Sequence, residues 1–281
     1  GTMPDVLVMT ATPIPRTLAL ILYGDLDISI IDELPPGRQK IDTFAVTKSL
    51  EERVNNFIKK VLNEGRQAYI VCPLVEESEN MDGLKSVTEQ FEYYKDVFKG
   101  FNVEILHGKM RPKEKDEIMT RYKNGEINVL ISTTVIEVGV DVPNATIMVI
   151  ENAERFGLAQ LHQLRGRVGR GKFKSYCILK YDSKSDVVRQ RMEIMQKSND
   201  GFVISEKDLE LRGPGEFFGT RQHGIPEFKI ANLFTDLPLL KQAQEASKEL
   251  LNKDVNLMLK ENLALKQKID KLFASREFNT I

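Results

Sequence analysis

The chain has 281 residues, of which 41% are hydrophobic and 29% charged, and its formal net charge is −1. These proportions are typical of a soluble globular protein with one large domain and an appendage, or with two domains. No stretch approaches the roughly 20 apolar residues that span a bilayer, and no signal-peptide pattern opens the chain, so we expect a cytoplasmic protein. Cys72 and Cys177 lie far apart in apolar runs, which predicts buried reduced thiols and no metal site.

The balanced net charge hides an uneven distribution. Residues 155–191 contain ten basic residues and only two acidic ones, so the rest of the chain is acidic. A solvated charged face usually mixes both signs, whereas a basic concentration of this kind is typical of phosphate binding.

From residue 41, short apolar runs alternate with amphipathic stretches. Strands are expected at 41–47, 67–75, 101–106, 127–133, 145–151 and 175–181. Helices are expected at 49–65, after the polar "ESENMDG" connection as far as about residue 98, and at 112–122. Ser49 with Glu52 predicts a capping box, and Gly65 a helix stop. Several strands are continuously apolar, which indicates a sheet covered on both faces. Residues 38–181 therefore predict a parallel α/β domain.

The two ends do not fit that domain. Residues 6–21 resemble a strand and helix without a partner strand, so residues 1–37 are expected to be the tail of another domain and a linker. Residues 182–235 are helical and rich in glycine; Ser205 with Asp208 predicts a helix start, and Gly213, Pro214 and Gly215 a hairpin reversal. Two further helices are expected within 236–281.

Two segments carry groups suited to phosphate chemistry. In 129–151, Thr133 and Thr134 follow a strand end, where they can hold a phosphate or simply cap a helix. Gly139 permits a tight turn, after which Asp141 is expected to point into the crevice at the carboxyl ends of the strands.

The second segment, "QLHQLRGRVGRGKFKSY" (160–176), places a glycine directly before each of two arginines. Gly166 and Gly169 let the backbone turn tightly, so that Arg167 and Arg170 can be directed at a phosphate held elsewhere. A guanidinium cannot deprotonate and offers five donors, which suits a transferring γ-phosphate. The alternative is that these arginines cap helix carbonyls or pair with surface acids.

Together these segments resemble motifs V and VI of superfamily 2 helicases. The motif VI pattern is carried by Gln163, Gly166, Arg167, Gly169 and Arg170. "TATP" (10–13) resembles motif III, and "ILHGKM" (105–110) the segment that contacts the nucleic-acid backbone. The resemblance implies a RecA-like parallel sheet covered by helices on both faces, followed by a helical hairpin and C-terminal helices.

Residues 204–233 resemble the TRG segment shared by RecG helicases and the transcription-repair coupling factor, and "FFGTRQ" is most similar to the RecG form. The sequence contains no phosphate loop and no DExH box. The resemblance therefore implies the C-terminal motor half of an ATP-dependent double-stranded DNA translocase or helicase that remodels stalled forks and branched recombination intermediates. ATP and Mg²⁺ would be bound mainly by an upstream motor domain, so this chain alone is expected to be inactive.

The resemblance also implies roles for individual residues. Arg167 and Arg170 would be catalytic. Nucleotide contacts would come from Gly139, Asp141 and Gln163, with Asp141 approaching either the nucleotide ribose or the arginines. DNA contacts would come from His107, Arg111, Thr133 and Thr134, although His107 also fits a capped strand end. Coupling of motor closure to DNA movement would involve Thr10, Thr12, Arg212, Arg221 and Gln222.

The expected partners are branched or duplex DNA and the upstream motor and wedge domains of the same protein, which we expect to be a monomer away from membranes. Two alternatives stay open: the same half of a transcription-repair coupling factor, and a catalytically inert DNA-binding module.

Overall fold

The computed structural model describes residues 7, 9–10, 29–33, 35, 38–73, 82–133, 141–218 and 237–277. The chain divides into two compact units, residues 1–220 and residues 221–281. The domain boundaries expected after residues 37, 181 and 235 remain predictions.

The first unit is built on one six-stranded parallel sheet with the strand order β1-β6-β5-β2-β4-β3. Its strands are β1 (Ile41–Val46), β2 (Gln67–Val71), β3 (Val103–Leu106), β4 (Val129–Ser132), β5 (Ala145–Ile150) and β6 (Ser175–Lys180). All strands start at one edge, called the amino edge below, and finish at the opposite, carboxyl edge. The parallel α/β architecture predicted for this region is confirmed, and each strand is slightly shorter than expected.

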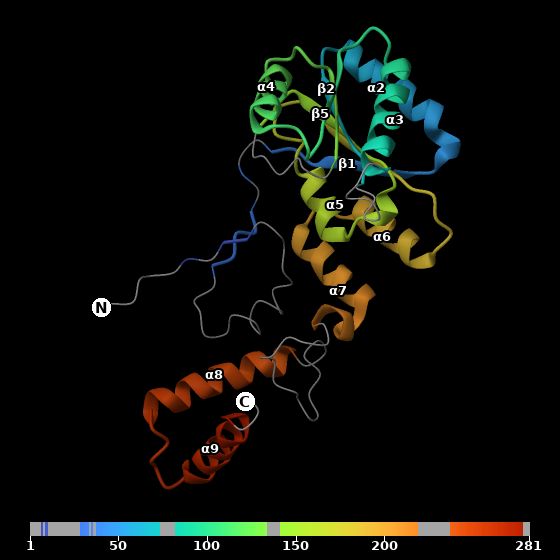
Figure 1. Ribbon diagram of the computed structural model, residues 1–281. Helices are drawn as coiled ribbons and strands as arrows, with labels where there is room; N and C mark the ends of the chain where they lie inside the picture. Colours follow the sequence, from blue (N-terminus) through green and yellow to red (C-terminus); the bar gives the residue numbers. More distant parts are fainter. Residues whose placement is uncertain are drawn as a thin grey trace. The chain divides into compact units, whose positions relative to one another are not determined.

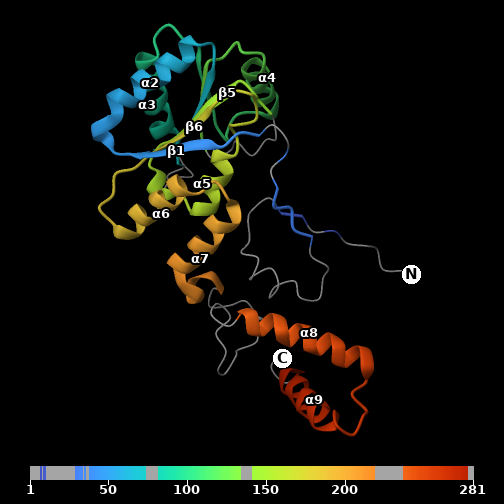
Figure 2. The same ribbon diagram turned by 180° about the vertical axis from the view of Figure 1, so that it is seen from behind.

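Helices cover both faces of the sheet (Figures 1 and 2). One face packs against α2 (Glu51–Asn63) and α3 (Asp82–Val97), and the other against α4 (Pro112–Lys123), α5 (Leu158–Arg165) and α6 (Asp186–Lys197). The helix α7 (Gly201–Phe218) packs against α5 and α6. Alternate residues of β2 show why the strands are apolar throughout: Ala68 and Ile70 face α2, whereas Tyr69 and Val71 belong to the cluster under α5.

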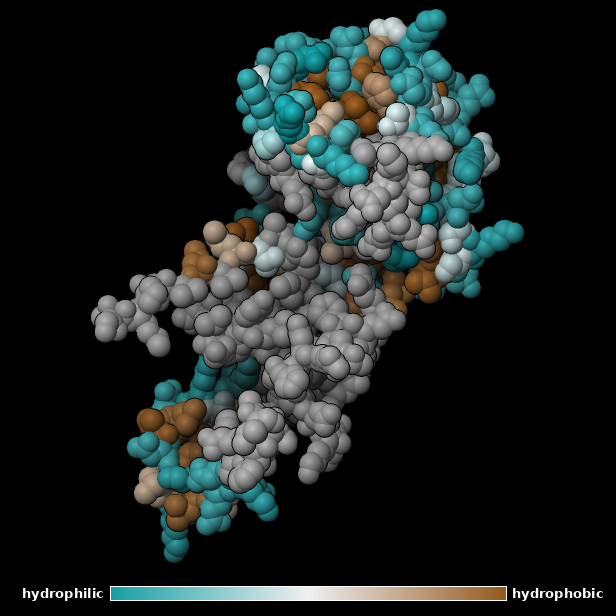
Figure 3. Space-filling view, in the orientation of Figure 1, coloured by the Kyte–Doolittle hydropathy of each residue, from teal (hydrophilic) through white to brown (hydrophobic). Residues whose placement is uncertain are grey.

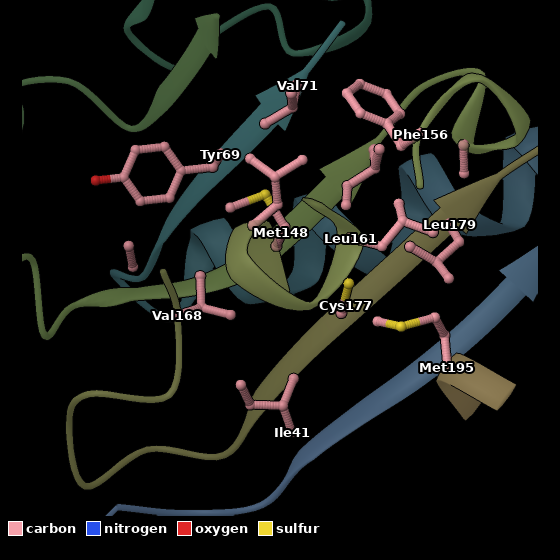
Figure 4. Close-up of a cluster of buried hydrophobic side chains, with 14 of the residues drawn as sticks. Ile41, Tyr69, Val71, Met148, Phe156, Leu161, Val168, Cys177, Leu179 and Met195 are labelled. Atoms are coloured by element: carbon pink, nitrogen blue, oxygen red, sulfur yellow. The ribbon is translucent and has the colours of Figure 1, made fainter. Parts of the chain in front are cut away.

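The apolar cluster under α5 and α6 also includes the chain segment that follows α5. Figure 4 shows Ile41 of β1, Tyr69 of β2 and Cys177 of β6 in the same cluster of buried side chains as Leu161 of α5. Val168, just beyond α5, is fully buried in the same cluster. The chain segment after α5 is therefore anchored to the sheet by an apolar side chain. Cys177 and Cys72 are both buried and free, as predicted.

The predicted start of the first helix is wrong. Residues 48–50 form a 3-10 turn, and α2 begins at Glu51 with Leu50 at the N-cap position and no side-chain cap. The Ser49 hydroxyl instead pairs with Thr47 Oγ1 at 2.9 Å. Acidic residues in the first turn, Glu51 and Glu52, favour the helix end electrostatically. The predicted stop at Gly65 is confirmed by its positive φ of 78°.

The predicted start and reversal in the TRG-like segment are also wrong. The helix α7 begins at Gly201, because the Asp200 carboxylate accepts hydrogen bonds from the Phe202 and Val203 amides. Ser205 lies inside the first turns and donates to the Phe202 carbonyl at 2.9 Å. The helix continues through residues 213–215 to Phe218. Pro214 removes one amide donor from this helix but does not end it.

The second unit contains the two helices expected near the C-terminus, α8 (Leu237–Lys253) and α9 (Leu263–Glu277). The Asp254 carboxylate organises their connection by accepting from the Met258 and Leu259 amides and from the Asn262 side chain, all within 2.9 Å. Apolar side chains are exposed on this unit, as the brown surface over α8 and α9 shows (Figure 3). No helix among the described residues has the length and apolar character needed to cross a membrane.

Candidate functional site

The arginine loop, defined here as residues 166–172, follows α5 and leads to the start of β6. It lies at the amino edge of the sheet, beside the start of β1. Gly169 has φ of +78°, and a Cβ there would lie 2.9 Å from Ile41 Cγ1. A Cβ on Gly171 would meet the Pro143 carbonyl oxygen. Two glycines of the loop are therefore required by close packing against neighbouring segments.

Gly166 has a different role from the one predicted. Its φ of −65° is helical and open to any residue, so it does not provide a special turn. Its carbonyl oxygen is the important group, because it accepts hydrogen bonds from Arg38 Nη2 at 2.8 Å and from Arg170 Nε at 3.3 Å. This carbonyl lies at the C-terminal end of α5, where the helix dipole favours cations.

Three guanidinium groups lie at the arginine loop, those of Arg38, Arg167 and Arg170. Arg170 is 28% exposed, and its Nη1 lies 3.5 Å from Asp141 Oδ1. Burial and the nearby Arg170 lower the pKa of Arg38, and Asp141 opposes the shift. Among the described residues, the Arg167 side chain has no hydrogen-bond or ion-pair partner. The site thus holds three cations against one carboxylate, which suits a polyanion such as a phosphate chain.

The third arginine of the sequence run is structural. Arg165 is only 1% exposed, and its Nη1 donates to the carbonyls of Met195 and Ser198, both at 2.8 Å. Its Nη2 lies 3.1 Å from His162 Nδ1. Arg165 therefore joins α5 to the end of α6.

The basic run of residues 155–191 is not one patch in space. Arg191 donates to the Phe156 and Glu154 carbonyls, and Arg189 pairs with Asp186 in the same helix. Lys180 is buried at the opposite edge of the sheet between Glu151 and Glu51. Within residues 155–191, the cations available to a ligand are those clustered in the arginine loop. The net charge of this run therefore predicted a larger basic site than the structure contains.

A second group of predicted residues meets at the carboxyl edge. His107 and Thr133 directly follow the paired ends of β3 and β4, where Leu106 is opposite Ser132. The Thr133 amide donates to the Leu106 carbonyl at 3.2 Å. Thr133 Oγ1 and His107 Nδ1 are both buried without a hydrogen-bond partner among the described residues. Buried polar atoms without a partner at the ends of two paired strands leave hydrogen-bonding capacity that a ligand can complete.

The charges around this pair are positive. Burial, Lys115 and Lys109 lower the pKa of His107, so its imidazole is neutral at pH 7. Arg111 is exposed and precedes the N-terminus of α4, where its amide donates to Glu114 Oε2 at 3.1 Å. A helix N-terminus with exposed cations beside it favours phosphate groups.

Asp141 does not lie at the carboxyl ends of the strands, as its loop predicted, but it does lie beside an arginine, which was one of the two contacts expected for it. It comes shortly before β5, and Asn144, close behind it, bonds to Arg66 and Gly65 at the amino edge. The connection from β4 to β5 returns from the carboxyl edge to the amino edge, as every parallel connection must. Asp141 therefore belongs with Arg170, and Thr133 lies at the other end of the strands.

A polar cavity of about 270 Å³ opens at the carboxyl ends of β1, β5 and β6. Lys180 pairs there with Glu151 at 2.8 Å and Glu51 at 3.0 Å, and Tyr94 bonds to Glu151. These groups satisfy one another, so the cluster is a structural network. Among the described residues, no group of three or more His, Cys, Asp or Glu side chains could hold a metal ion.

Both parts of the chain match families of one protein class. Residues 52–172 match the family "Helicase conserved C-terminal domain", and residues 198–278 match "ATP-dependent DNA helicase RecG, domain 3, C-terminal". The chain is 52% identical over 255 residues to the ATP-dependent DNA helicase RecG of Bacillus subtilis, covering 90% of this chain and 37% of that protein. The chain matches the C-terminal part of RecG helicases.

A second RecG sequence and a RecG structure show the same similarity. Identity to RecG of Thermotoga maritima is 50% over 251 residues, covering 89% of this chain and 32% of that protein. The structure titled "Structure of RecG bound to three-way DNA junction" matches with a TM-score of 0.67 and 46% identity, over 86% of this chain and 31% of that chain. The chain thus spans about a third of the length of these RecG relatives and corresponds to their C-terminal part, and the RecA-like fold predicted for it is confirmed.

Several predicted site residues lie where the structure gives no side-chain placement. Thr12, Thr134, Gly139, Arg221 and Gln222 lie outside the described residues. Arg212 is on α7, and Thr10 and Gln163 are exposed.

Sequence reasoning missed Arg38. It directly follows Pro35, Pro36 and Gly37 and precedes β1. Its position just before a strand could have predicted its role, because the start of that strand lies at the same edge of the sheet as the arginine loop.

Proposed function

We propose that this chain is the C-terminal motor half of an ATP-dependent double-stranded DNA helicase or translocase that remodels stalled forks and branched recombination intermediates. The observation that carries the proposal is the arginine loop. It presents Arg167 and Arg170 from an anchored segment at the sheet edge, next to a single carboxylate, Asp141.

The chemistry of this edge fits a triphosphate and does not fit Mg²⁺. Guanidinium groups donate to phosphate oxygens and stabilise the charge that develops on a transferring γ-phosphate. Mg²⁺ takes oxygen ligands, chiefly carboxylates and water, and Asp141 is paired to Arg170. We therefore assign to an upstream motor domain the binding of Mg²⁺ and most of the nucleotide, and to this chain the arginines that complete the site. Gln163 and Gly139 would line the same cleft.

DNA is assigned to the carboxyl edge. His107 and Thr133 offer buried polar atoms, Arg111 offers an exposed cation, and Thr134 follows in the chain. Such contacts to sugar and phosphate hold position without reading sequence, so the shape of the DNA would decide preference. ATP and DNA would thus act at opposite ends of the same strands, which lets the rigid sheet transmit closure of the nucleotide site to the DNA.

The remaining assignments complete the proposal. The partners are branched or duplex DNA and the upstream motor and wedge domains of the same polypeptide, in a cytoplasmic monomer. Thr10, Thr12, Arg212, Arg221 and Gln222 would couple closure to DNA movement. The RecG match over residues 198–278 favours this function over the transcription-repair coupling factor.

The test is Arg170→Ala in the full-length protein that contains this chain. DNA-stimulated ATP turnover should fall at least a hundredfold, in line with the loss of one positioned donor to a transition-state charge. Binding to a model fork should stay within about threefold, because DNA contacts the opposite edge. Arg189→Ala is the control, since Arg189 lies in the same basic run but pairs with Asp186 on the surface of α6. Unchanged turnover in Arg170→Ala would reject the proposal.

A further inference from the structure

The segment immediately before β1 is fastened to the arginine loop at three points. Arg38 Nη2 donates to the Gly166 carbonyl at 2.8 Å, and Gln39 Nε2 donates to the Lys172 carbonyl at 2.8 Å. Between them, Ile41 packs so closely on Gly169 that a Cβ there would not fit. The path of residues 38–41 and the path of the arginine loop are therefore determined together.

Arg38 and Arg170 share one acceptor. The Gly166 carbonyl takes a short bond from Arg38 and a longer one, 3.3 Å, from Arg170. Arg38 is half-buried, and the shift of its pKa has the Arg170 charge among its causes, after burial. Two like charges on one carbonyl repel each other, and Arg38 makes the shorter bond to the oxygen.

We propose that Arg38 is a positioning residue for Arg170. It occupies the carbonyl at the end of α5 and, by charge repulsion, keeps the Arg170 guanidinium turned outward, toward Asp141 and the phosphate cleft. Without Arg38, the Arg170 guanidinium would move closer to the Gly166 carbonyl than its present 3.3 Å and away from the cleft, because the helix dipole attracts the cation. This inference rests on the proposed function, because it assigns a role relative to the catalytic arginine.

The position of Arg38 gives this contact a further consequence. Arg38 ends the segment that leads into the first strand of the sheet, and its amide is held by the Pro35 carbonyl at 3.2 Å. A displacement of that segment would therefore pull directly on the arginine loop. Arg38 links the chain entering the sheet to the orientation of the catalytic group.

The experiment compares Arg38→Ala with Gln39→Ala in the full-length protein. Gln39 makes a bond of the same length to the same loop but is exposed and uncharged, so it controls for loss of a tether. Arg38→Ala should lower kcat for ATP about tenfold, equivalent to about 1.4 kcal/mol, with KM for ATP unchanged. Gln39→Ala should keep kcat within about twofold, and both variants should melt within about 2 °C of the wild type because each loses one partly exposed hydrogen bond.

Two further variants separate positioning from other roles. Arg38→Lys keeps the charge and one donor, so its kcat should recover to within about threefold of the wild type. In single-turnover measurements, Arg38→Ala/Arg170→Ala should be no slower than Arg170→Ala alone, because Arg38 acts through Arg170.

The failures are distinguishable. Wild-type turnover in Arg170→Ala would reject the proposed function itself. If Arg170→Ala is inactive and Arg38→Ala has wild-type kcat, only the role of Arg38 is rejected. It is equally rejected if Arg38→Lys is as slow as Arg38→Ala, or if the double variant is a further tenfold slower, which would mean that Arg38 acts independently of Arg170.

Discussion

Replacing Gly169 by alanine tests whether the arginine loop is held by close packing. Two costs combine at this residue. A φ of +78° costs a residue with a Cβ about 1–2 kcal/mol. The added Cβ would also lie 2.9 Å from Ile41 Cγ1, well inside the distance at which carbon atoms attract. Overpacking of this kind costs about 1–3 kcal/mol.

Gly65 provides a matched control, because its φ is also +78° but nothing lies within 4 Å of its added Cβ. Gly65→Ala therefore carries only the backbone cost, partly offset by about 0.4–1 kcal/mol of lost freedom in the unfolded chain. We expect a net loss of about 1 kcal/mol for Gly65→Ala and about 2–4 kcal/mol for Gly169→Ala. At about 2–4 °C per kcal/mol, the Gly169→Ala melting temperature should fall clearly below that of Gly65→Ala.

Urea denaturation of both variants gives the free energy of unfolding, and thermal denaturation gives the melting temperature. ATP turnover is then measured in the full-length protein. Gly169→Ala should also lower kcat at least tenfold, because a displacement of about 1 Å at a catalytic group costs up to a hundredfold. Gly65→Ala should leave kcat unchanged. Equal stability losses in the two variants would show that the contact with Ile41 costs nothing. Full turnover in Gly169→Ala would show that the orientation of the loop is set elsewhere.

Three other predictions concern buried charges. Lys180→Met should destabilise by about 3–5 kcal/mol in thermal unfolding, since it leaves the Glu151 carboxylate buried without its cation; Lys180→Met/Glu151→Gln should recover part of that loss. Arg165→Lys should lower the melting temperature, because an ammonium cannot reach both carbonyls that the guanidinium holds. Each carbonyl left without a donor costs about 1–3 kcal/mol. An unchanged melting temperature would contradict the structural role. Burial, Arg165 and Arg38 lower the pKa of His162 to about 4, so stability should be full above pH 6.5 and decline as the pH falls from 6.5 toward 4. His162→Asn keeps an acceptor near Nδ1 and should flatten the dependence of the urea midpoint on pH in that window; an equal slope in both proteins would refute the assignment.

Much of the fold follows from local sequence. The continuous apolar strands at 67–71 and 145–150 predicted a sheet buried on both faces, and this is confirmed by helices on each side. Helix starts were less predictable. At Ser49 and Ser205 the hydroxyls bond to near neighbours instead of capping, and such local competition between weak hydrogen bonds is not visible in a pattern of residue types.

The candidate site shows the same division. The amino-acid sequence by itself determined that Arg167 and Arg170 follow glycines and that Thr133 ends a strand, because these are properties of neighbouring residues. Only the tertiary structure decided that Asp141 lies beside Arg170, while Thr133 lies next to the strand end that leads into His107. It also showed that Arg165 is buried and bonded to the end of α6, and that Arg38 donates to the Gly166 carbonyl. The reason is geometric: a parallel sheet carries the chain from one edge to the other between consecutive strands. Residues eight apart can therefore lie at opposite ends of the domain, and residues separated by 128 positions can be joined by one hydrogen bond.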